Sequence, residues 1–164
     1  MTQNPIDFSK QLVKGRIAET LFEQMLRDAG GFTILAFGYE SVLPELAHRQ
    51  HDLQAEETME IIRRAPDFAV IDNKSHEVNL IEVKYRMNPR AENILNIASL
   101  MHDSWKPAYL FLATPMGFFY DKASDIIEQK GIIKKLNKYP QITDELQEKY
   151  IELLNQFIPP TARN

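Results

Sequence analysis

The sequence predicts an α/β fold with a mixed central sheet that is flanked by helices. The first observation is the order of the expected elements, which run helix, strand, strand, strand, helix, strand and then further helices. This order is typical of a sheet with helices packed on its faces. The second is the length of 164 residues, which fits one domain. We therefore expect a single domain over residues 1–164, with a core at about 9–121 and a helical C-terminal extension at about 122–158.

The N-terminal part of the chain predicts a long helix and a strand. Apolar residues recur at helical spacing over residues 9–29, Ser9 is the expected N-cap, and a glycine pair at 30–31 would end the helix. Residues 32–40 are rich in aromatic and β-branched side chains and predict a strand. Residues 41–65 suit a helix start at their Ser and Pro, but their weak period leaves this segment ambiguous.

A β-hairpin is expected in the middle of the chain, because two apolar runs flank a polar turn at residues 73–76. Its strands cover residues 67–72 and 77–85. An Asn-Pro pair at 88–89 then separates the hairpin from the next helix. The remaining expected elements are a helix at about 90–104, a buried strand at 108–114, a short strand at 118–120, and two helices near 123–138 and 142–157.

The composition excludes several classes of protein. The chain has no cysteine, so disulfides, thiolate zinc sites and a cysteine nucleophile are ruled out. No apolar run approaches the roughly 20 residues that cross a bilayer, and the first residues do not resemble a signal peptide. The sequence therefore predicts a soluble, cytoplasmic protein with no membrane partner.

The charges are segregated along the chain. The formal net charge of −4 and the pI of about 5.6 argue against nucleic-acid binding over the whole surface. Basic groups nevertheless gather at residues 10–16, 84–90 and 130–138, and the acidic excess lies at 52–60 and 144–152. One such cluster is ordinarily a solvated helix face, but a local basic groove would still attract phosphates.

Three charged residues of the expected hairpin form a candidate site: Asp67, Glu82 and Lys84. Glu82 and Lys84 are two apart on one strand, so both side chains point to the same face. If the turn is centred between residues 74 and 75, opposed residues have numbers that sum to 149, and Asp67 lies opposite Glu82. Opposed residues share a face with Cβ atoms about 5 Å apart, so two carboxylates and an ammonium converge. A slip of one residue would scatter them.

Two directly opposed carboxylates destabilise a strand pair, so they need a cation beside them. A divalent hard ion such as Mg²⁺ or Mn²⁺ suits this position because it prefers carboxylate and carbonyl oxygens. Lys84 would then hold or help deprotonate a water, or stabilise a pentavalent phosphate, as in metal-assisted hydrolysis. The alternative is a solvated salt-bridging stripe of Glu82 and Lys84. The apolar character of the strand and the mirror position of Asp67 argue against it.

A further acid lies on the first expected helix. Glu19 shares its side of the helix with Phe22 at i+3 and Leu26 at i+7, so it lies at the margin of the core-facing stripe. A role at the site and an ordinary helix-boundary charge both remain open for this residue.

The spacing of these residues resembles a known signature. The dipeptide at 66–67, a spacer of fourteen residues and the tripeptide at 82–84 resemble the motif of the PD-(D/E)xK nuclease superfamily, which has the restriction-endonuclease-like fold. The expected α-β-β-β-α-β order resembles the core of that fold over roughly residues 9–121. Residues 14–19 are similar to the first core helix of Holliday-junction-resolvase-like and archaeal-type members.

The resemblance implies a Mg²⁺- or Mn²⁺-dependent nuclease that hydrolyses phosphodiester bonds in DNA. By position, Asp67 and Glu82 would bind the metal together with the carbonyl of Val83. Lys84 would position the nucleophilic water, and Glu19 would add an acid from the first helix, directly or through water. Small enzymes of this type often work as homodimers, so the resemblance also implies a second copy that addresses the second strand.

Nucleic-acid contacts are expected from basic and aromatic residues near the site, namely Lys14, Arg16, Tyr85, Arg86 and Arg90. An ordinary strand-end role is equally open for Tyr85 and Arg86. Because the chain as a whole is acidic, we expect weak non-specific DNA binding that depends on the metal or on a protein partner that supplies DNA affinity.

Two other functions remain open. A catalytically silent protein of this fold would act as a binding or assembly module in a larger complex, with the acidic stretches 52–60 and 144–152 as partner surfaces. Metal titration separates it from an enzyme, because a silent module need not bind Mg²⁺. An enzyme of similar fold that acts on RNA would differ in its substrate rather than in its site.

Overall fold

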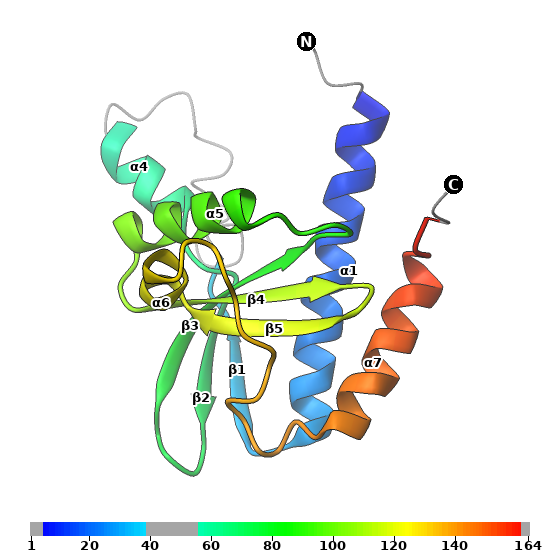
Figure 1. Cartoon of the computed structure of the whole chain (residues 1–164). Coiled ribbons are helices and arrows are strands. Elements are labelled where there is room, and N and C mark those ends of the chain that lie inside the picture. Colours follow the sequence, from blue (N-terminus) through cyan, green and yellow to red (C-terminus); the bar gives the residue numbers. More distant parts are fainter. Residues whose placement is uncertain (1–4, 39–55, 162–164) are drawn as a thin grey trace.

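The computed structural model of the chain describes residues 5–38 and 56–161. Its centre is an open five-stranded sheet with the strand order β1-β2-β3-β4-β5 (Figure 1). Neighbouring strands are antiparallel except β3 and β4, which run parallel and are connected through helix α5. The predicted α/β class with a mixed sheet is therefore confirmed. The strands are β1 (Phe32–Ala36), β2 (Phe68–Asp72), β3 (Val78–Tyr85), β4 (Ala108–Thr114) and β5 (Gly117–Lys122).

Helices cover both faces of this sheet (Figure 1). Helices α1 and α7 pack on one face, and α5 and α6 pack on the other, each pair over its own apolar core. Among the helices of the described residues, none is long and apolar enough to cross a membrane. The helices are α1 (Pro5–Ala29), α4 (Glu56–Arg63), α5 (Ala91–Ser104), α6 (Ala123–Glu128) and α7 (Asp144–Phe157).

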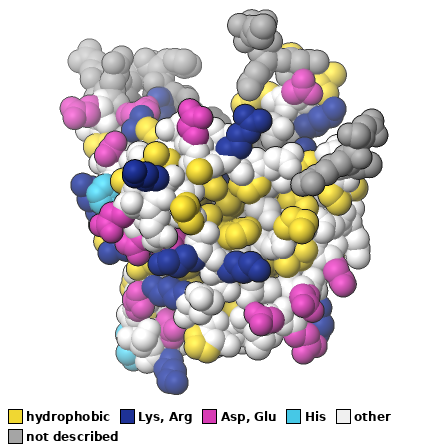
Figure 2. All heavy atoms as spheres, viewed as in Figure 1, with side chains coloured by type: hydrophobic (Ala, Val, Ile, Leu, Met, Phe, Trp, Pro, Cys, Tyr) yellow, Lys and Arg dark blue, Asp and Glu magenta, His cyan; other side chains and the backbone are white. Residues whose placement is uncertain are grey.

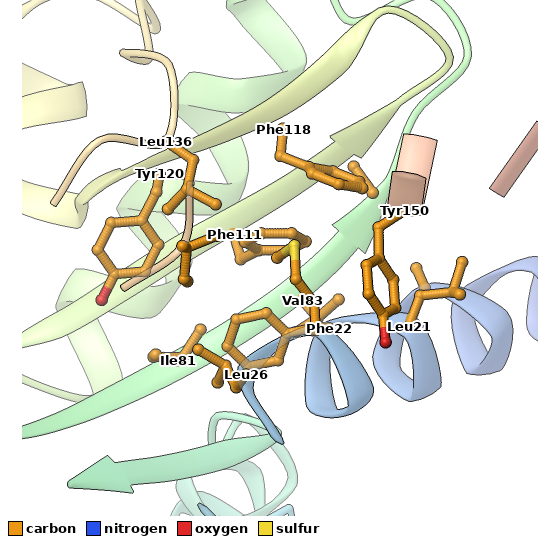
Figure 3. Close-up of a cluster of buried hydrophobic side chains, with 14 of the residues drawn as sticks. Leu21, Phe22, Leu26, Ile81, Val83, Phe111, Phe118, Tyr120, Leu136 and Tyr150 are labelled. Atoms are coloured by element: carbon orange, nitrogen blue, oxygen red, sulfur yellow. The ribbon is translucent and has the colours of Figure 1, made fainter. Parts of the chain in front are cut away.

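The larger core lies between the sheet and helices α1 and α7, and it is rich in aromatic rings (Figure 3). The Phe22 ring of α1 contacts the ring of Phe111 on β4, with centroids 4.6 Å apart. Alternate residues of β3, among them Ile81 and Val83, are buried on this side. Since side chains alternate along a strand, the intervening Glu82 points to the other side.

The register of the hairpin is the predicted one. The Asp72 carboxylate holds the turn, because its Oδ1 accepts the N–H groups of Lys74 and Ser75 at 2.8 and 3.2 Å. The turn therefore sets the register in which β2 pairs with β3. Opposed residues have numbers that sum to 149, in the pairs Phe68–Ile81, Ala69–Leu80, Val70–Asn79 and Ile71–Val78.

Some boundaries in the N-terminal part differ from the prediction. Helix α1 covers Pro5–Ala29 and so includes residues before the predicted start at Ser9. The Ser9 hydroxyl donates to the Pro5 carbonyl at 3.0 Å and so lies inside the helix rather than capping it. Strand β1 ends before residue 37. The suggested helix start within residues 41–44 lies outside the described residues.

The predicted helix near 123–138 is wrong over its second half. Helix α6 ends in a Schellman cap, in which Lys130 has a φ of +55° and the Gly131 N–H donates to the Ile126 carbonyl at 2.9 Å. The chain then follows β5, where the Leu136 N–H donates to the Phe118 carbonyl at 3.0 Å. Pairing with β5 and burial of the leucine outweigh the local preference for helix.

Candidate functional site

A cleft of about 650 Å³ lies beside the C-terminal end of β3. All four predicted catalytic residues line it: Glu19 from α1, Asp67 just before β2, and Glu82 and Lys84 from β3. In Figure 1, α1 and α4 lie on either side of the end of β3. The fold thus brings together residues that are far apart in the sequence.

Asp67 is held in the cleft by hydrogen bonds to β3 and to the residues that follow β1. Strand β2 begins only after this residue, and the Asp67 Oδ2 accepts the Val83 N–H at 2.8 Å. The Asp67 carbonyl accepts the N–H groups of Phe37 and Gly38 at 2.8 and 3.2 Å. In a strand the N–H and carbonyl of one residue point to the same side, so the Val83 carbonyl also points toward Asp67.

Glu82 and Lys84 lie side by side on β3, the middle strand of the sheet, and form an ion pair. Their side chains are 16% and 34% exposed, which does not fit a fully solvated stripe. Burial disfavours the ammonium, but Glu82 and Asp67 together hold the pKa of Lys84 above its usual range. Lys84 is therefore a charged hydrogen-bond donor within the cleft.

The acids of the cleft are in an electrostatically unfavourable position. Burial and the nearby Glu82 raise the pKa of Asp67 to about 6, against the opposing effects of Lys84 and the Val83 N–H. Burial and Asp67 likewise raise the pKa of Glu19. A single lysine therefore does not compensate the negative charge of these carboxylates.

The donor set fits a divalent hard cation. It consists of carboxylate oxygens and one backbone carbonyl, which are the ligands that Mg²⁺ and Mn²⁺ prefer. Glu19 is bound to Arg16 at 2.9 Å, and Glu82 is bound to Lys84. Within residues 5–38 and 56–161, no three acidic or histidine side chains are grouped closely enough to hold a metal as they stand.

Four of the five predicted nucleic-acid contacts line the cleft: Lys14, Arg16, Tyr85 and Arg86. The Tyr85 side chain is buried, and its hydroxyl has no hydrogen-bond partner in the part of the chain that the structure describes. Arg90 is exposed at the N-cap of α5 and does not line the cleft. Arg90 therefore lies away from the site predicted for it.

Two further basic residues of the cleft were not predicted from the sequence. Arg63 and Arg64 line it from the end of α4. They lie in the segment whose hydrophobic period is weak, so no pattern assigns them to a helix face. The one signal in the sequence is that this pair stands directly before Ala65, Pro66 and Asp67.

Comparison with known proteins gives no family assignment. No model of a known protein family matches the chain, and no curated protein sequence matches it. The interpretation of the cleft therefore depends on its own residues.

Proposed function

We propose that this protein is a metal-dependent nuclease of the restriction-endonuclease-like fold that hydrolyses phosphodiester bonds in DNA. The observation that carries the proposal is the meeting of Asp67, Glu82 and Lys84 in one cleft. The hairpin register that brings them together is the one expected from a turn centred between residues 74 and 75. The order α1-β1-β2-β3-α5-β4, with α4 inserted before β2, also agrees with the core that this resemblance implies.

The carboxylates would hold the metal. Asp67, Glu82 and the Val83 carbonyl would bind Mg²⁺ or Mn²⁺, and Glu19 would add a carboxylate from α1. A bound divalent ion would polarise the phosphate and lower the pKa of a water molecule. The same positive charge would offset the burial and the repulsion from Glu82 that raise the pKa of Asp67.

Lys84 would act as a donor at the reacting phosphate. Because Glu82 and Asp67 keep its ammonium charged, we assign it the orientation of the attacking water and the stabilisation of negative charge, rather than the role of a base. Arg16 and Arg86, which line the same cleft, would contact neighbouring phosphates.

Incubation with labelled single-stranded, duplex and branched DNA, and with RNA, tests the proposal. We expect DNA to be cut with Mg²⁺ or Mn²⁺ and to stay intact with EDTA. Asp67→Asn should abolish cleavage, whereas Asp121→Asn, which changes a buried carboxylate outside the cleft, should preserve it. If the protein cuts only RNA, the substrate is RNA rather than DNA. A wild type that cuts nothing, or an Asp67→Asn variant as active as wild type, would contradict the proposal.

A catalytically silent binding module is the second candidate, and exposed apolar side chains favour it. Met116 at the β4–β5 turn is 88% exposed, and Phe157 at the end of α7 is 63% exposed. Figure 2 shows hydrophobic side chains gathered in the middle of the viewed face. Calorimetric titration with Mg²⁺ separates the candidates, because binding that Asp67→Asn abolishes supports the enzyme, and no binding by the wild type supports the module.

A further inference from the structure

The end of α4 carries two arginines that the mechanism above does not use. Arg63 and Arg64 line the cleft beside the acids. We infer that they bind backbone phosphates of the strand that is cut, next to the phosphate that reacts. The inference rests on the proposed nuclease function and specifies how its substrate is held.

The chain places these arginines close to the acids. Only Ala65 and Pro66 separate Arg64 from Asp67, so the Cα atoms of Arg64 and Asp67 are at most about 11 Å apart. Pro66 is buried and cannot rotate freely about φ. A phosphate bound by the arginines would therefore lie near the one that Asp67 addresses.

Helix α4 contacts the rest of the fold near its last turn. The Trp105 indole N–H donates to the Ile61 carbonyl at 3.0 Å. The same indole meets the Phe37 ring edge-on, with centroids 5.3 Å apart. Met59 of α4 is 4% exposed and anchors the inner side of the helix. These contacts hold the helix that presents the two arginines to the cleft.

A single acid holds both guanidinium groups. Glu60 accepts the Arg64 Nε–H at 3.0 Å and lies 3.9 Å from Arg63. The side chains are 50% exposed for Glu60 and 37% and 38% exposed for the two arginines, so these ion pairs are weak in solvent. A phosphate, like a carboxylate, accepts two parallel N–H bonds from a guanidinium, so a backbone phosphate can compete with Glu60 for these weakly held arginines.

The charge of the cleft favours a polyanion even though the chain is acidic. The cleft lining carries six cationic and four acidic side chains, whereas the whole chain has a formal charge of −4. The cations come from α1, α4 and the end of β3, so they surround the acids. A strand with phosphates on both sides of the reacting one matches this arrangement, and a lone phosphomonoester does not. The cations are Lys14, Arg16, Arg63, Arg64, Lys84 and Arg86, and the acids are Glu19, Glu23, Asp67 and Glu82.

The volume of the cleft compares with the size of one strand. A volume of about 650 Å³ lies within the range of small-ligand pockets, roughly 300–1,000 Å³. It holds a short stretch of one strand, but not the full cross-section of a duplex. A duplex substrate would have to present one of its strands to the cleft.

Fluorescence anisotropy with a labelled single-stranded DNA oligonucleotide, in EDTA so that nothing is cut, tests this phosphate site. Affinity is measured over about 50 to 300 mM KCl for the wild type and for the double variant Arg63→Gln/Arg64→Gln. We expect the slope of log affinity against log salt concentration to become shallower by about 1.4, because each phosphate contact on a single strand contributes about 0.7.

Lys149→Gln is the matched control. Lys149 is also an exposed cation on a helix and is paired at 3.1 Å with an acid four residues earlier, Glu145, and neither residue lines the cleft. We expect it to keep the wild-type slope. The variant Arg63→Lys/Arg64→Lys retains the charges and should also keep most of that slope.

The outcomes separate this phosphate site from the nuclease proposal. A double glutamine variant with wild-type affinity and slope overturns the phosphate site, as does a wild type that does not bind the oligonucleotide. If the slope changes as expected but the wild type cuts no DNA with Mg²⁺, the phosphate site stands and the nuclease proposal fails. Thermal melts check that each variant is folded. If the double variant is unfolded, Arg63→Gln and Arg64→Gln are tested singly, each with an expected change of about 0.7.

Discussion

The Val83 N–H donates a 2.8 Å hydrogen bond to the Oδ2 atom of Asp67. This bond forms where the ladder between β2 and β3 has just ended, so the Asp67 side chain takes the place of a strand partner. The strand that carries Glu82 and Lys84 therefore also holds Asp67. The geometry of the cleft is a property of the hairpin, and we expect it to be lost if the hairpin register changes.

Replacing Asp67 with Asn should stabilise the metal-free protein in a pH-dependent manner. Burial and Glu82 raise the pKa of Asp67 to about 6. Between about pH 4 and pH 6 the folded state therefore binds a proton that the unfolded state has lost. The free energy of unfolding of the wild type should fall as the pH rises through this window, by up to about 3 kcal/mol. Asparagine does not titrate and should escape this loss.

Chemical denaturation near pH 4 and near pH 7.5 measures the difference. Asp67→Asn should be more stable than the wild type at the higher pH and similar to it at the lower pH. Asp103→Asn, which changes an exposed acid of α5, should follow the wild type at both. An equal gain for Asp67→Asn at the two pH values would show that the carboxyl does not titrate as described.

The Tyr150 hydroxyl joins α7 to α1 by donating to the Asp28 Oδ2 at 2.5 Å. Burial and this bond raise the pKa of Tyr150 to about 12. Tyr150→Phe should lower the free energy of unfolding by about 1.5–3 kcal/mol, because the acceptor is charged. A double-mutant cycle with Asp28→Asn isolates the pair. A coupling energy near zero would mean that the bond does not stabilise the fold.

Two glycine substitutions should have opposite effects on stability. Gly131 has a φ of +88°, and a Cβ there would collide with the Ala91 carbonyl, so Gly131→Ala should destabilise by about 2–4 kcal/mol. Gly15 lies inside α1 with nothing within 4 Å of a Cβ, and Gly15→Ala should stabilise by about 0.5–1 kcal/mol. Denaturant melts measure both changes. Equal effects would contradict the close packing at Gly131.

The central hairpin is predictable from the sequence because independent local signals agree. The polar turn, the apolar alternation and the requirement to keep one face buried select a single register. Strand β4 and helices α5 and α7 likewise lie within two residues of their predicted bounds, since strong periodicity and an Asn-Pro break mark them. The sequence alone therefore predicts that Asp67, Glu82 and Lys84 lie close together.

Features that depend on contacts between distant residues could not be predicted from the sequence. The chain after α6 is not a helix because residues near Leu136 pair with β5. No local sequence pattern predicts that pairing. Helix α4, which brings Arg63 and Arg64 to the cleft, is hydrogen-bonded at Ile61 to the Trp105 indole, 44 residues away. Such a contact becomes visible only when the chain is folded.

Single-turnover cleavage of labelled DNA at saturating enzyme, started by adding Mg²⁺, measures most directly whether Asp67, Glu82 and Lys84 form a catalytic site. Lys84→Met should cut at least about 100-fold more slowly than the wild type, because a positioned hydrogen-bond donor at the developing charge contributes roughly 10²–10³-fold. Lys138→Met, which changes a lysine paired at 2.8 Å with Glu77 at the other end of the hairpin, should cut at the wild-type rate. A wild type that cuts no DNA, or a Lys84→Met variant that cuts as fast as the wild type, would contradict catalysis in this cleft.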